Sequence, residues 1–426
     1  MPGGPGINGV RLTGGVVTLN YARGRSGGRV LRNRCWAGIA TGTLAAGLLA
    51  VPGAAMAAAV LRVCHHGCAY TQIQPAVDAA AAGDTIAVGS GTYSGGILIA
   101  KALTLAGAGA GSTVISGGGP VITVSGGPVV IRAVTVTGGK SSGDGGGIFS
   151  TGTLTVVSAT IRDNTASGSG GGIAAEDYAT LSLRSDEVSR NSAEFGGGLE
   201  VVYHATATIS DATVRANSAV LTGGGIDVTG ATLHLSGTSV DANQTKSYGY
   251  GGGVEVEGIR YRAFSVATIT DSVVNGDFAG TGGGIDVEAM VTARLDDDVI
   301  SHDAARYAGG GISDGGPFSS LTVSGTSITG DTSGGDGGGI SNIGNARLTN
   351  DSVNANSAAR RGGGIYNGSE RIGHPVIGAL TLDAATSVDR NSAAAGGGIY
   401  VAAGTVAADG ATVRRNTPDD CEPAAC

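Results

Sequence analysis

The chain has 426 residues, of which 80 are glycine, while only 4% are aromatic and 14% are charged. Glycine so far above the roughly 7% of average proteins excludes an ordinary globular domain and indicates a repetitive backbone. Collagen is excluded because the glycines do not recur at every third position, and a disordered linker is excluded because valine, isoleucine and leucine are frequent. We therefore expect a core built from small aliphatic side chains.

The first 57 residues have the composition of a secretory signal peptide. They contain six arginines and no acidic residue, and an apolar stretch leads to small residues at Ala55, Met56 and Ala57. This order predicts a cleaved signal over residues 1–57. A membrane anchor is the alternative, because the uncharged run is long enough to span a bilayer. A start at Val30 would leave a signal of conventional length.

Removal of this segment makes the chain strongly acidic. Without its six arginines the 26 basic residues fall to 20, against 34 acidic residues, so the formal net charge changes from −8 to −14. Nucleic acid and anionic membranes are then excluded as partners, because both require a basic surface. We expect a secreted or cell-surface monomer with no membrane span, whose partners are extracellular polysaccharides or components of a host or cell surface.

Residues 58–116 are predicted to form an N-terminal cap and the first coils of a repetitive fold. Ile73, Val77 and Ala80 recur at helical spacing within 70–83, and a glycine ends the segment, which predicts a short amphipathic helix. Short strands are expected to begin at 84–88 and 91–93. A helix in this position would cover the open end of a stacked core.

Four cysteines of the exported chain form two close pairs at its opposite ends. Cys64 and Cys68 lie near the predicted helix, and Cys421 and Cys426 lie in a C-terminal tail over residues 419–426. An oxidising compartment favours two local disulfides. A metal site that uses Cys64, Cys68 and the two intervening histidines is the alternative for the first pair.

Residues 117–418 contain ten repeats, each marked by three consecutive glycines and an aliphatic residue. The triplets recur every 25 to 34 residues, a period that predicts a solenoid. They begin at Gly145, Gly170, Gly196, Gly223, Gly251, Gly282, Gly309, Gly337, Gly362 and Gly396.

One repeat, GGGIDVTGATLHLSGTSVDANQTKSYGY, indicates the shape of each unit. The apolar residues Ile226 and Val228 flank Asp227, and Leu233 and Leu235 flank His234 in the same way. Turn residues separate these short runs. Alternation with period two predicts strands. The fold class that we predict is all-β: a right-handed parallel β-helix solenoid with three short strands per coil. Glycine fits the triplets because each coil turns sharply there between closely stacked backbones.

A second column of residues precedes the glycine triplets and is interpreted as structural. Asparagine suits a bend, and its amide can bond to the backbone or to the same residue one coil away, whereas aspartate would disfavour a continuous buried ladder. The column consists of Asn164, Asn191, Asn217, Asn243, Asp277, Asp303, Asp331, Asn356, Asn391 and Asn416.

The repeat units NSAEFGGGL, NSAVLTGGGI and NSAARRGGGI resemble those of polymorphic outer membrane proteins and related secreted β-helix proteins of the pectin-lyase-like superfamily. The segment with Ile73 and Gln74, followed by the Gly-Asp-Thr-Ile and Gly-Thr-Tyr motifs, resembles the start of pectinesterase-like β-helices. The resemblance implies the fold and secretion. It does not imply a chemistry, because the sequence lacks the active-site motifs of pectinesterases, polygalacturonases and pectate lyases.

The residue after each aliphatic residue is expected to point outward, and four consecutive coils place a carboxylate there. These are Glu200, Asp227, Glu255 and Asp286, with Glu257 and Glu288 nearby. Stacked carboxylates raise one another's pKa or attract a cation, so calcium is the one ion that this column suggests; no other cofactor is expected. The structural alternative is a charged, solvent-facing strand surface that prevents aggregation.

Aromatic and basic residues in the neighbouring loops would turn this acid column into a binding site. Tyr248, Tyr250, Arg260 and Arg262 precede or follow the acidic strands and suggest a groove for an extended polymer. Our leading hypothesis is an adhesin-like structural or glycan-binding protein rather than an enzyme. The alternative is a polysaccharide lyase or glycoside hydrolase acting on acidic polysaccharides, in which Asp227 and Glu255 are the acid and base or calcium ligands and an arginine neutralises a uronate.

Overall fold

The computed structural model describes residues 58–246, 248–259, 263–316, 318–369 and 378–423, and also the backbone of two strands near the N-terminus. Contacts divide the chain into two units, Met1–Met56 and Ala57–Cys426. In the first unit, β1 (Val10–Thr13) and β2 (Val16–Leu19) pair antiparallel. Most of the predicted signal segment lies outside the described residues. Among the described residues, no helix is both long and apolar enough to cross a membrane.

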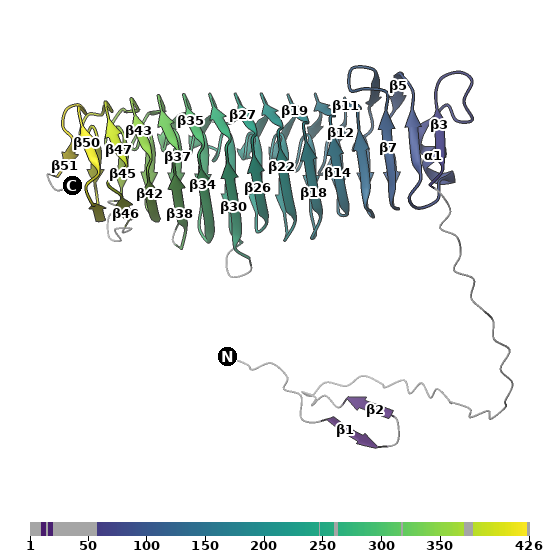
Figure 1. Cartoon of the computed structure of the whole chain (residues 1–426), viewed down its shortest axis with the longest axis horizontal. Helices are drawn as coiled ribbons and strands as arrows, with labels where there is room; N and C mark the ends of the chain where they lie inside the picture. The colour runs from purple at the N-terminus through teal and green to yellow at the C-terminus, as the bar shows by residue number, and fades with distance from the viewer. Residues whose placement is uncertain are drawn as a thin grey trace. The chain divides into compact units, whose positions relative to one another are not determined.

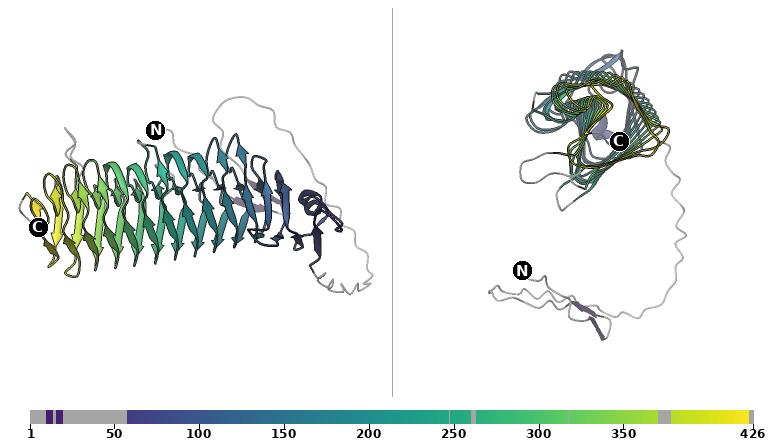
Figure 2. Two further views of the ribbon diagram at one scale, coloured as in Figure 1. Left: turned by 90° about the horizontal axis from the view of Figure 1, so that it is seen from above. Right: turned by 90° about the vertical axis from the view of Figure 1, so that its left-hand side faces the viewer.

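The second unit is a parallel β-helix, as the sequence predicts. Its coils stack into a column in Figure 1, and the end-on view in Figure 2 shows successive coils superimposed. Strands of successive coils pair in parallel to form four long sheets, which we number I to IV in the order in which a coil passes through them.

Sheet I has 14 strands. They are β3 (Val60–Val63), β4 (Thr85–Val88), β7 (Leu103–Gly107), β10 (Val129–Arg132), β14 (Thr153–Val157), β18 (Thr180–Arg184), β22 (Thr206–Ser210), β26 (Thr232–Ser236), β30 (Ser265–Thr270), β34 (Val291–Asp296), β38 (Ser320–Ser324), β42 (Asn345–Thr349), β46 (Gly378–Leu382) and β49 (Gly404–Ala408).

Sheet II has 13 strands. They are β5 (Gly91–Ser94), β8 (Thr113–Ser116), β11 (Thr135–Thr137), β15 (Thr160–Arg162), β19 (Glu187–Ser189), β23 (Thr213–Arg215), β27 (Ser239–Asp241), β31 (Val273–Asn275), β35 (Val299–Ser301), β39 (Ser327–Thr329), β43 (Ser352–Asn354), β47 (Ser387–Asp389) and β50 (Thr412–Arg414).

Sheet III is a fourth, short element that the three-strand prediction missed. It precedes the glycine triplets in nine coils of the described chain, and several of its strands have only two residues. Its strands are β12 (Lys140–Ser141), β16 (Thr165–Ala166), β20 (Ser192–Phe195), β24 (Ser218–Thr222), β28 (Gln244–Thr245), β32 (Phe278–Thr281), β36 (Ala304–Ala308), β40 (Thr332–Ser333) and β44 (Ser357–Ala358). Segments this short show no alternation that a sequence pattern could reveal.

Sheet IV follows the glycine triplets and has 13 strands. They are β6 (Ile97–Ile99), β9 (Ile122–Val124), β13 (Ile148–Ser150), β17 (Ile173–Ala175), β21 (Leu199–Val202), β25 (Ile226–Thr229), β29 (Val254–Glu257), β33 (Ile285–Val287), β37 (Ile312–Asp314), β41 (Ile340–Asn342), β45 (Ile365–Asn367), β48 (Ile399–Val401) and β51 (Cys421–Glu422).

The core is a column of aliphatic side chains that runs along the inside of the coils. Ile226 and Val228 of sheet IV, Leu233 of sheet I and Val240 of sheet II are all 0% exposed, as the alternation predicts. Each coil repeats these positions in register with the next, so the apolar surface of one coil is covered by its neighbours.

The asparagine column is buried and forms the predicted ladder. The Asn191 amide nitrogen donates to the Asn217 carbonyl oxygen at 3.1 Å, and the Asn217 amide donates to Asn243 at 3.0 Å. The same amides also donate to a backbone carbonyl of the preceding coil, at 2.9 Å for Asn191 and Ile161. The ladder therefore joins the coils at the bend between sheets II and III.

Aspartates continue the ladder, contrary to the expectation that they would interrupt it. Asp277, Asp303 and Asp331 are at most 1% exposed, and the Oδ1 atom of each accepts the backbone N–H of the preceding rung, as in the 2.7 Å bond from Asp277 to Asp303. The Oδ2 atom of each has no hydrogen-bond partner in the described structure. Burial, the first cause, raises the pKa of all three carboxyls well above the usual value.

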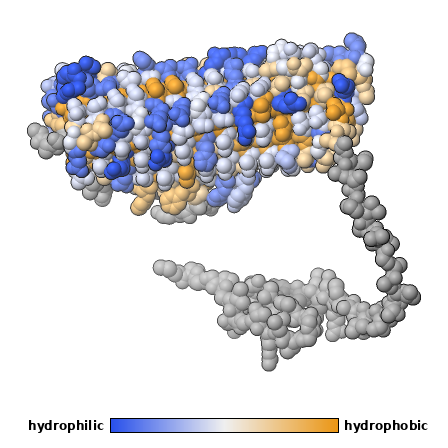
Figure 3. Space-filling model, in the orientation of Figure 1, coloured by the Kyte–Doolittle hydropathy of each residue, from blue (hydrophilic) through white to orange (hydrophobic). Residues whose placement is uncertain are grey.

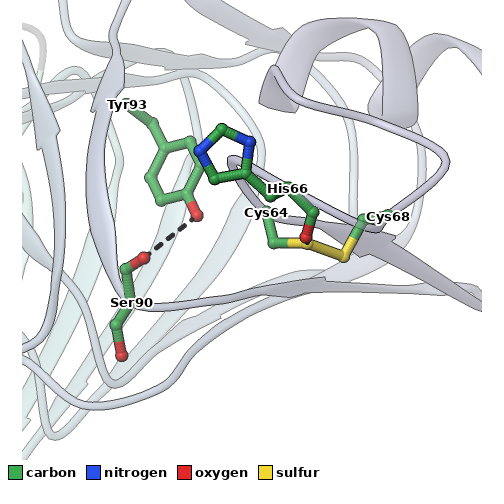
Figure 4. The surroundings of a disulfide bond; sticks show 5 residues. All are labelled: Cys64, His66, Cys68, Ser90 and Tyr93. Carbon is green, nitrogen blue, oxygen red and sulfur yellow. Dashed lines mark hydrogen bonds between the residues drawn. A yellow bond between two sulfur atoms is a disulfide. The ribbon is translucent and has the colours of Figure 1, made fainter.

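The predicted cap is present at the N-terminal end of the column. Helix α1 (Ile73–Ala79) buries Ile73 and Val77 against the first coils, and it is the one helix among the described residues. Cys64 and Cys68 form a disulfide, as predicted, close to Tyr93, whose hydroxyl donates to the Ser90 carbonyl at 3.4 Å (Figure 4). The predicted partner of Cys421 is Cys426, which lies outside the described residues.

The glycine triplets satisfy two separate geometric requirements. Gly223, the first of its triplet, has a φ of +57° and lies against the backbone of Asp227. Gly224 has an ordinary φ, but a Cβ atom there would lie 2.4 Å from the Gly252 carbonyl oxygen of the next coil. The first glycine thus makes the turn, and the second permits close approach of the coils.

Candidate functional site

The acid column stacks as predicted. We call the outer-face residue that follows the first aliphatic residue of each sheet IV strand a floor residue. Glu200 is in register with Asp227, Asp227 with Glu255, and Glu255 with Asp286. The same register extends the column in both directions along sheet IV. The floor residues are Phe149, Ala174, Glu200, Asp227, Glu255, Asp286, Ser313, Ser341, Tyr366 and Tyr400.

The four acids are buried, which corrects the expectation of a solvent-facing surface. Glu200 is 8% exposed, Asp227 and Glu255 are each 2% exposed, and Asp286 is 0% exposed. The charged-surface explanation of this column is therefore wrong. A surface charge that prevents aggregation has to be in water.

The residues immediately before the glycine triplets cover one side of the floor, and we call them the entry wall. They pair from coil to coil as a parallel ladder, for example Thr222 with Tyr250 and Tyr250 with Thr281. Because each first glycine turns the chain sharply, the wall lies beside the floor of its own coil, and the Thr222 hydroxyl bonds to the Asp227 carboxylate. The wall depends on sheet III and its turn, so strand alternation does not reveal it.

The residue two positions after each floor residue forms the opposite side, which we call the exit wall. Thr229 belongs to it and donates to Asp227 Oδ1 at 3.0 Å. Two hydroxyl donors thus hold Asp227 from the two walls. Burial raises its pKa to about 6, while the bonds from Thr222 and Thr229 lower it and limit the rise.

The two following acids have a different environment. Glu255 Oε2 is buried without a hydrogen-bond partner in the described structure, whereas the side chains of Ser313 and Glu255 lie beside Asp286 and lower its pKa. Burial and the adjacent charges, Asp286 for Glu255 and Glu288 for Asp286, raise both pKa values well above the usual range. The charged forms of both carboxyls are therefore disfavoured, because ionised neighbours in this apolar setting would repel one another.

Beyond Asp286 the floor consists of Ser313, Ser341 and then Tyr366, and the walls enclose an open groove of about 700 Å³. It follows the column through the coils of Tyr250 to Tyr366, four coil steps or about 19 Å at roughly 4.8 Å per step. The residues that line the groove are Tyr250, Thr281, Ala308, Asp336 and Arg361 of the entry wall, Ser313, Ser341 and Tyr366 of the floor, Glu288, Gly315 and Ile343 of the exit wall, and Arg360 and Ser369.

The C-terminal end of the groove carries an ordered basic and aromatic cluster. Arg361 binds the Asp336 carboxylate through two nitrogens, each at 3.0 Å. Its guanidinium carbon lies 5.0 Å from the ring centre of Tyr366 and 5.1 Å from that of Tyr400, in cation–π contact with both. Neighbouring Arg360 has a 65% exposed side chain and lies 3.9 Å from Asp336, so it supplies a cation at the groove surface.

At the opposite end of the groove, Glu288 is a half-buried carboxyl that lines the opening. Burial and the charge of Glu257 raise its pKa. A raised pKa favours the protonated form of a carboxyl, which is the form that can donate a proton to a bound molecule. The groove thus joins an acidic end to a basic and aromatic end.

The structure brings together only some of the residues predicted for the site. Tyr250 lines the groove with 43% of its surface exposed, and Tyr248, at 77% exposed, packs its ring 5.8 Å from that of Tyr307. Arg260 and Arg262 lie outside the described residues. Among the candidate acids, Asp227 and Glu255 stay beneath the walls and do not line the groove. The face in Figure 3 mixes hydrophilic and hydrophobic residues along the column.

One comparison with known protein families agrees with the architecture. A family model described as "Right handed beta helix region" matches residues 103–258. A comparison with curated proteins finds no significant match.

Solved structures that are similar to this chain include three polysaccharide-acting enzymes. The Azotobacter vinelandii mannuronan C-5 epimerase AlgE6 A-module is 14% identical, with 80% of this chain and 93% of that chain covered and a TM-score of 0.42. A mannuronic acid specific family 6 lyase from human gut microbiota is 10% identical, with 74% and 77% covered and a TM-score of 0.37. Pectin methylesterase PemA from Erwinia chrysanthemi is 11% identical, with 81% and 80% covered and a TM-score of 0.21.

Sequence reasoning located the column but missed the groove. The predicted site did not include the groove residues Ser313, Ser341 and Arg361, because the prediction rested on the column of carboxylates, which ends before them. Aligned repeats show that the floor residue changes along the column from acid to serine to tyrosine. The groove between the walls begins at this change.

Proposed function

We propose that this protein is an exported β-helix that binds an extended polysaccharide chain in the groove between Tyr250 and Arg361. The observation that carries the proposal is the groove itself, which runs along the column axis and repeats its lining positions once per coil. A linear polymer can use such a site because equivalent groups recur along both partners. Export rests on the composition of residues 1–57.

The groove offers the contacts that sugars use. Tyr250 presents an exposed ring at one end, Ser313 and Ser341 supply hydroxyls along the floor, and Arg360 supplies a charged donor at the other end. Aromatic faces accommodate the apolar side of a sugar ring, and hydroxyl and guanidinium groups bond to its oxygens. Arg360 would favour a glycan that carries a carboxylate at that position.

A binding measurement with matched variants tests this function. We expect Tyr250→Ala and Arg360→Ala each to weaken binding about tenfold in calorimetry against a panel of plant and bacterial polysaccharides, since one exposed contact contributes roughly 1–1.5 kcal/mol. Tyr178→Ala and Arg347→Ala are the controls, because both residues are exposed and neither lines the groove. Equal losses in groove and control variants would contradict the assignment.

Cleavage of the bound glycan is the second candidate function, and the position of Glu288 favours it. A carboxyl that lines the groove and has a raised pKa can act as the acid that protonates a glycosidic oxygen. We expect Glu288→Gln to abolish reducing-end release, at least 100-fold, while it leaves glycan affinity within about twofold. Release by the wild type that persists in this variant would exclude Glu288 as the proton donor. Wild-type binding without release would leave the protein as a binding module.

A further inference from the structure

We propose that Asp144, Glu176 and Glu200 bind one calcium ion at the N-terminal end of the floor column. The three residues come from three successive coils. Asp144 belongs to the entry wall, Glu176 to the exit wall after β17, and Glu200 to the floor in β21. This cluster lies outside the groove that we assign to the glycan.

The carboxylate oxygens converge on one point. One oxygen from each of the three side chains lies within 4.8 Å of the other two. Asp144 is held in place because its Oδ1 accepts the Ser169 backbone N–H at 2.7 Å. Glu200 is in register with Ala174, whose methyl group is too small to fill the space between the walls. The fold therefore gathers three acids beside a floor position that carries only the Ala174 methyl group.

A second observation points to a ligand rather than to chance proximity. Glu200 is only 8% exposed. The Ser169 side chain hydrogen-bonds to its carboxyl, but its Oε2 atom is buried without a hydrogen-bond partner in the described structure. A buried carboxylate oxygen without a donor is costly unless something else neutralises it. Asp227, the next floor acid, shows the contrast, because hydroxyls of both walls bond to it. At Glu200 a cation between Asp144 and Glu176 would supply the missing partner.

The chemistry of the cluster selects calcium among the common ions. All three ligands are oxygens, which hard cations prefer, and no histidine or cysteine belongs to the cluster. Calcium binds oxygens at about 2.3–2.6 Å, so two ligands of one ion can lie nearly 5 Å apart. Magnesium requires about 2.0–2.1 Å and therefore a tighter cluster. Water would complete the coordination on the open side.

The electrostatics of the cluster without an ion agree with this assignment. Burial raises the pKa of Glu200 to about 9 and that of Glu176 to about 7, and the neighbouring charge of Asp144 adds to both. Asp227 also raises the pKa of Glu200, and Asp177 that of Glu176. A divalent cation would reverse this repulsion and ionise the cluster, with release of protons.

Calorimetry of the full chain with calcium chloride, after removal of metal by a chelator, tests the site. We expect one saturable site with Kd on the order of 10⁻⁴ M, the range of weak extracellular calcium sites, and magnesium at least tenfold weaker. Glu200→Gln should weaken calcium binding at least tenfold and remove the rise in Tm that calcium causes. Its Tm without calcium should not fall, because a neutral amide replaces a group that holds its proton there.

Two further variants keep the test decisive. Glu176→Gln, on the half-buried wall, should give the same loss of calcium binding if Glu200→Gln fails to fold. Glu194→Gln removes one exposed charge from β20 and should keep wild-type affinity. No saturable binding by the wild type at millimolar calcium, or unchanged Kd in both cluster variants, would overturn the proposal. Because the titrant is the ion alone, these outcomes are separate from the success or failure of glycan binding.

Discussion

Individual carboxyl groups have different roles in this protein because their partners differ. Asp227 is bonded to hydroxyls from both walls, Glu255 has a buried oxygen without a partner in the described structure, and Asp303 lies inside the asparagine ladder. Burial raises the pKa in every case, but only the partners decide whether the group is structural or open to a ligand. An acidic residue in the sequence is not sufficient to distinguish these situations.

At the residue scale, we expect Asp303→Asn to stabilise the protein at pH 8 by about 1–3 kcal/mol. The wild-type carboxyl has a raised pKa in the folded state, so folding binds a proton, and stability falls as the pH rises from the unfolded value near 4 through the folded value. The amide needs no proton and can donate to Asp331, as Asn243 donates to Asp277 at 3.0 Å.

Urea unfolding at pH 5 and pH 8 measures this difference. The gain in the free energy of unfolding should be larger at pH 8 than at pH 5. Asp271→Asn is the control, because Asp271 is exposed and lies outside the ladder. A gain that is equal at both pH values would mean that proton binding by Asp303 does not limit stability.

At the scale of the element, each coil is shaped by the turn between sheets III and IV. Gly223 makes the turn with positive φ, and Gly224 allows the next coil to approach. The same turn folds the entry wall beside the floor, so the geometry that closes the coil also builds the groove and the calcium cluster. A change at the turn should therefore affect stability and site together.

We expect Gly224→Val to destabilise the protein by about 3 kcal/mol or more. Its Cβ atom would lie 2.4 Å from the Gly252 carbonyl oxygen and 2.6 Å from backbone atoms of Gln244, and neither can move without separating the coils. Gly111→Val is the matched control, since a Cβ atom at Gly111 meets nothing within 4 Å. Equal unfolding midpoints in urea for the two variants would contradict this account of the triplet.

At the scale of the whole molecule, the second unit is a one-dimensional stack in which each coil contacts its neighbours. Sheets I, II and IV add one strand per coil, and sheet IV strands pair in register from β21 to β29. Stability is then approximately a sum over coils and their interfaces. Helix α1 covers the first coil, and the aliphatic column continues through the repeats.

Deletion of residues 223–250, one complete coil, should leave a folded protein. Thr222 would join Gly251, and because Thr222 and Tyr250 are equivalent in the wall, the strands of the next coil keep their register. We expect far-UV circular dichroism of β type and a cooperative thermal transition. Deletion of 223–236, half a coil, should abolish both. Loss of the transition in the whole-coil variant would show that the coils are not interchangeable.

How much the sequence determines differs between fold and site. The glycine triplets, the alternation of Ile226 and Val228, and the asparagine column were sufficient to predict the β-helix, because each follows from local backbone geometry repeated at a fixed period. The stacking of Glu200, Asp227, Glu255 and Asp286 follows from the same register.

Only the tertiary structure decided what surrounds those acids. Sheet III is too short for a sequence pattern, and its turn folds residues such as Thr222 and Arg361 beside the floor of sheet IV. This arrangement buries the acids and leaves a groove along the floor from Ser313 to Tyr366. The meeting of Asp144, Glu176 and Glu200 likewise depends on three different coils. Alternation of apolar and polar residues indicates which side of a strand a residue lies on. Its burial depends on the segment that covers that side.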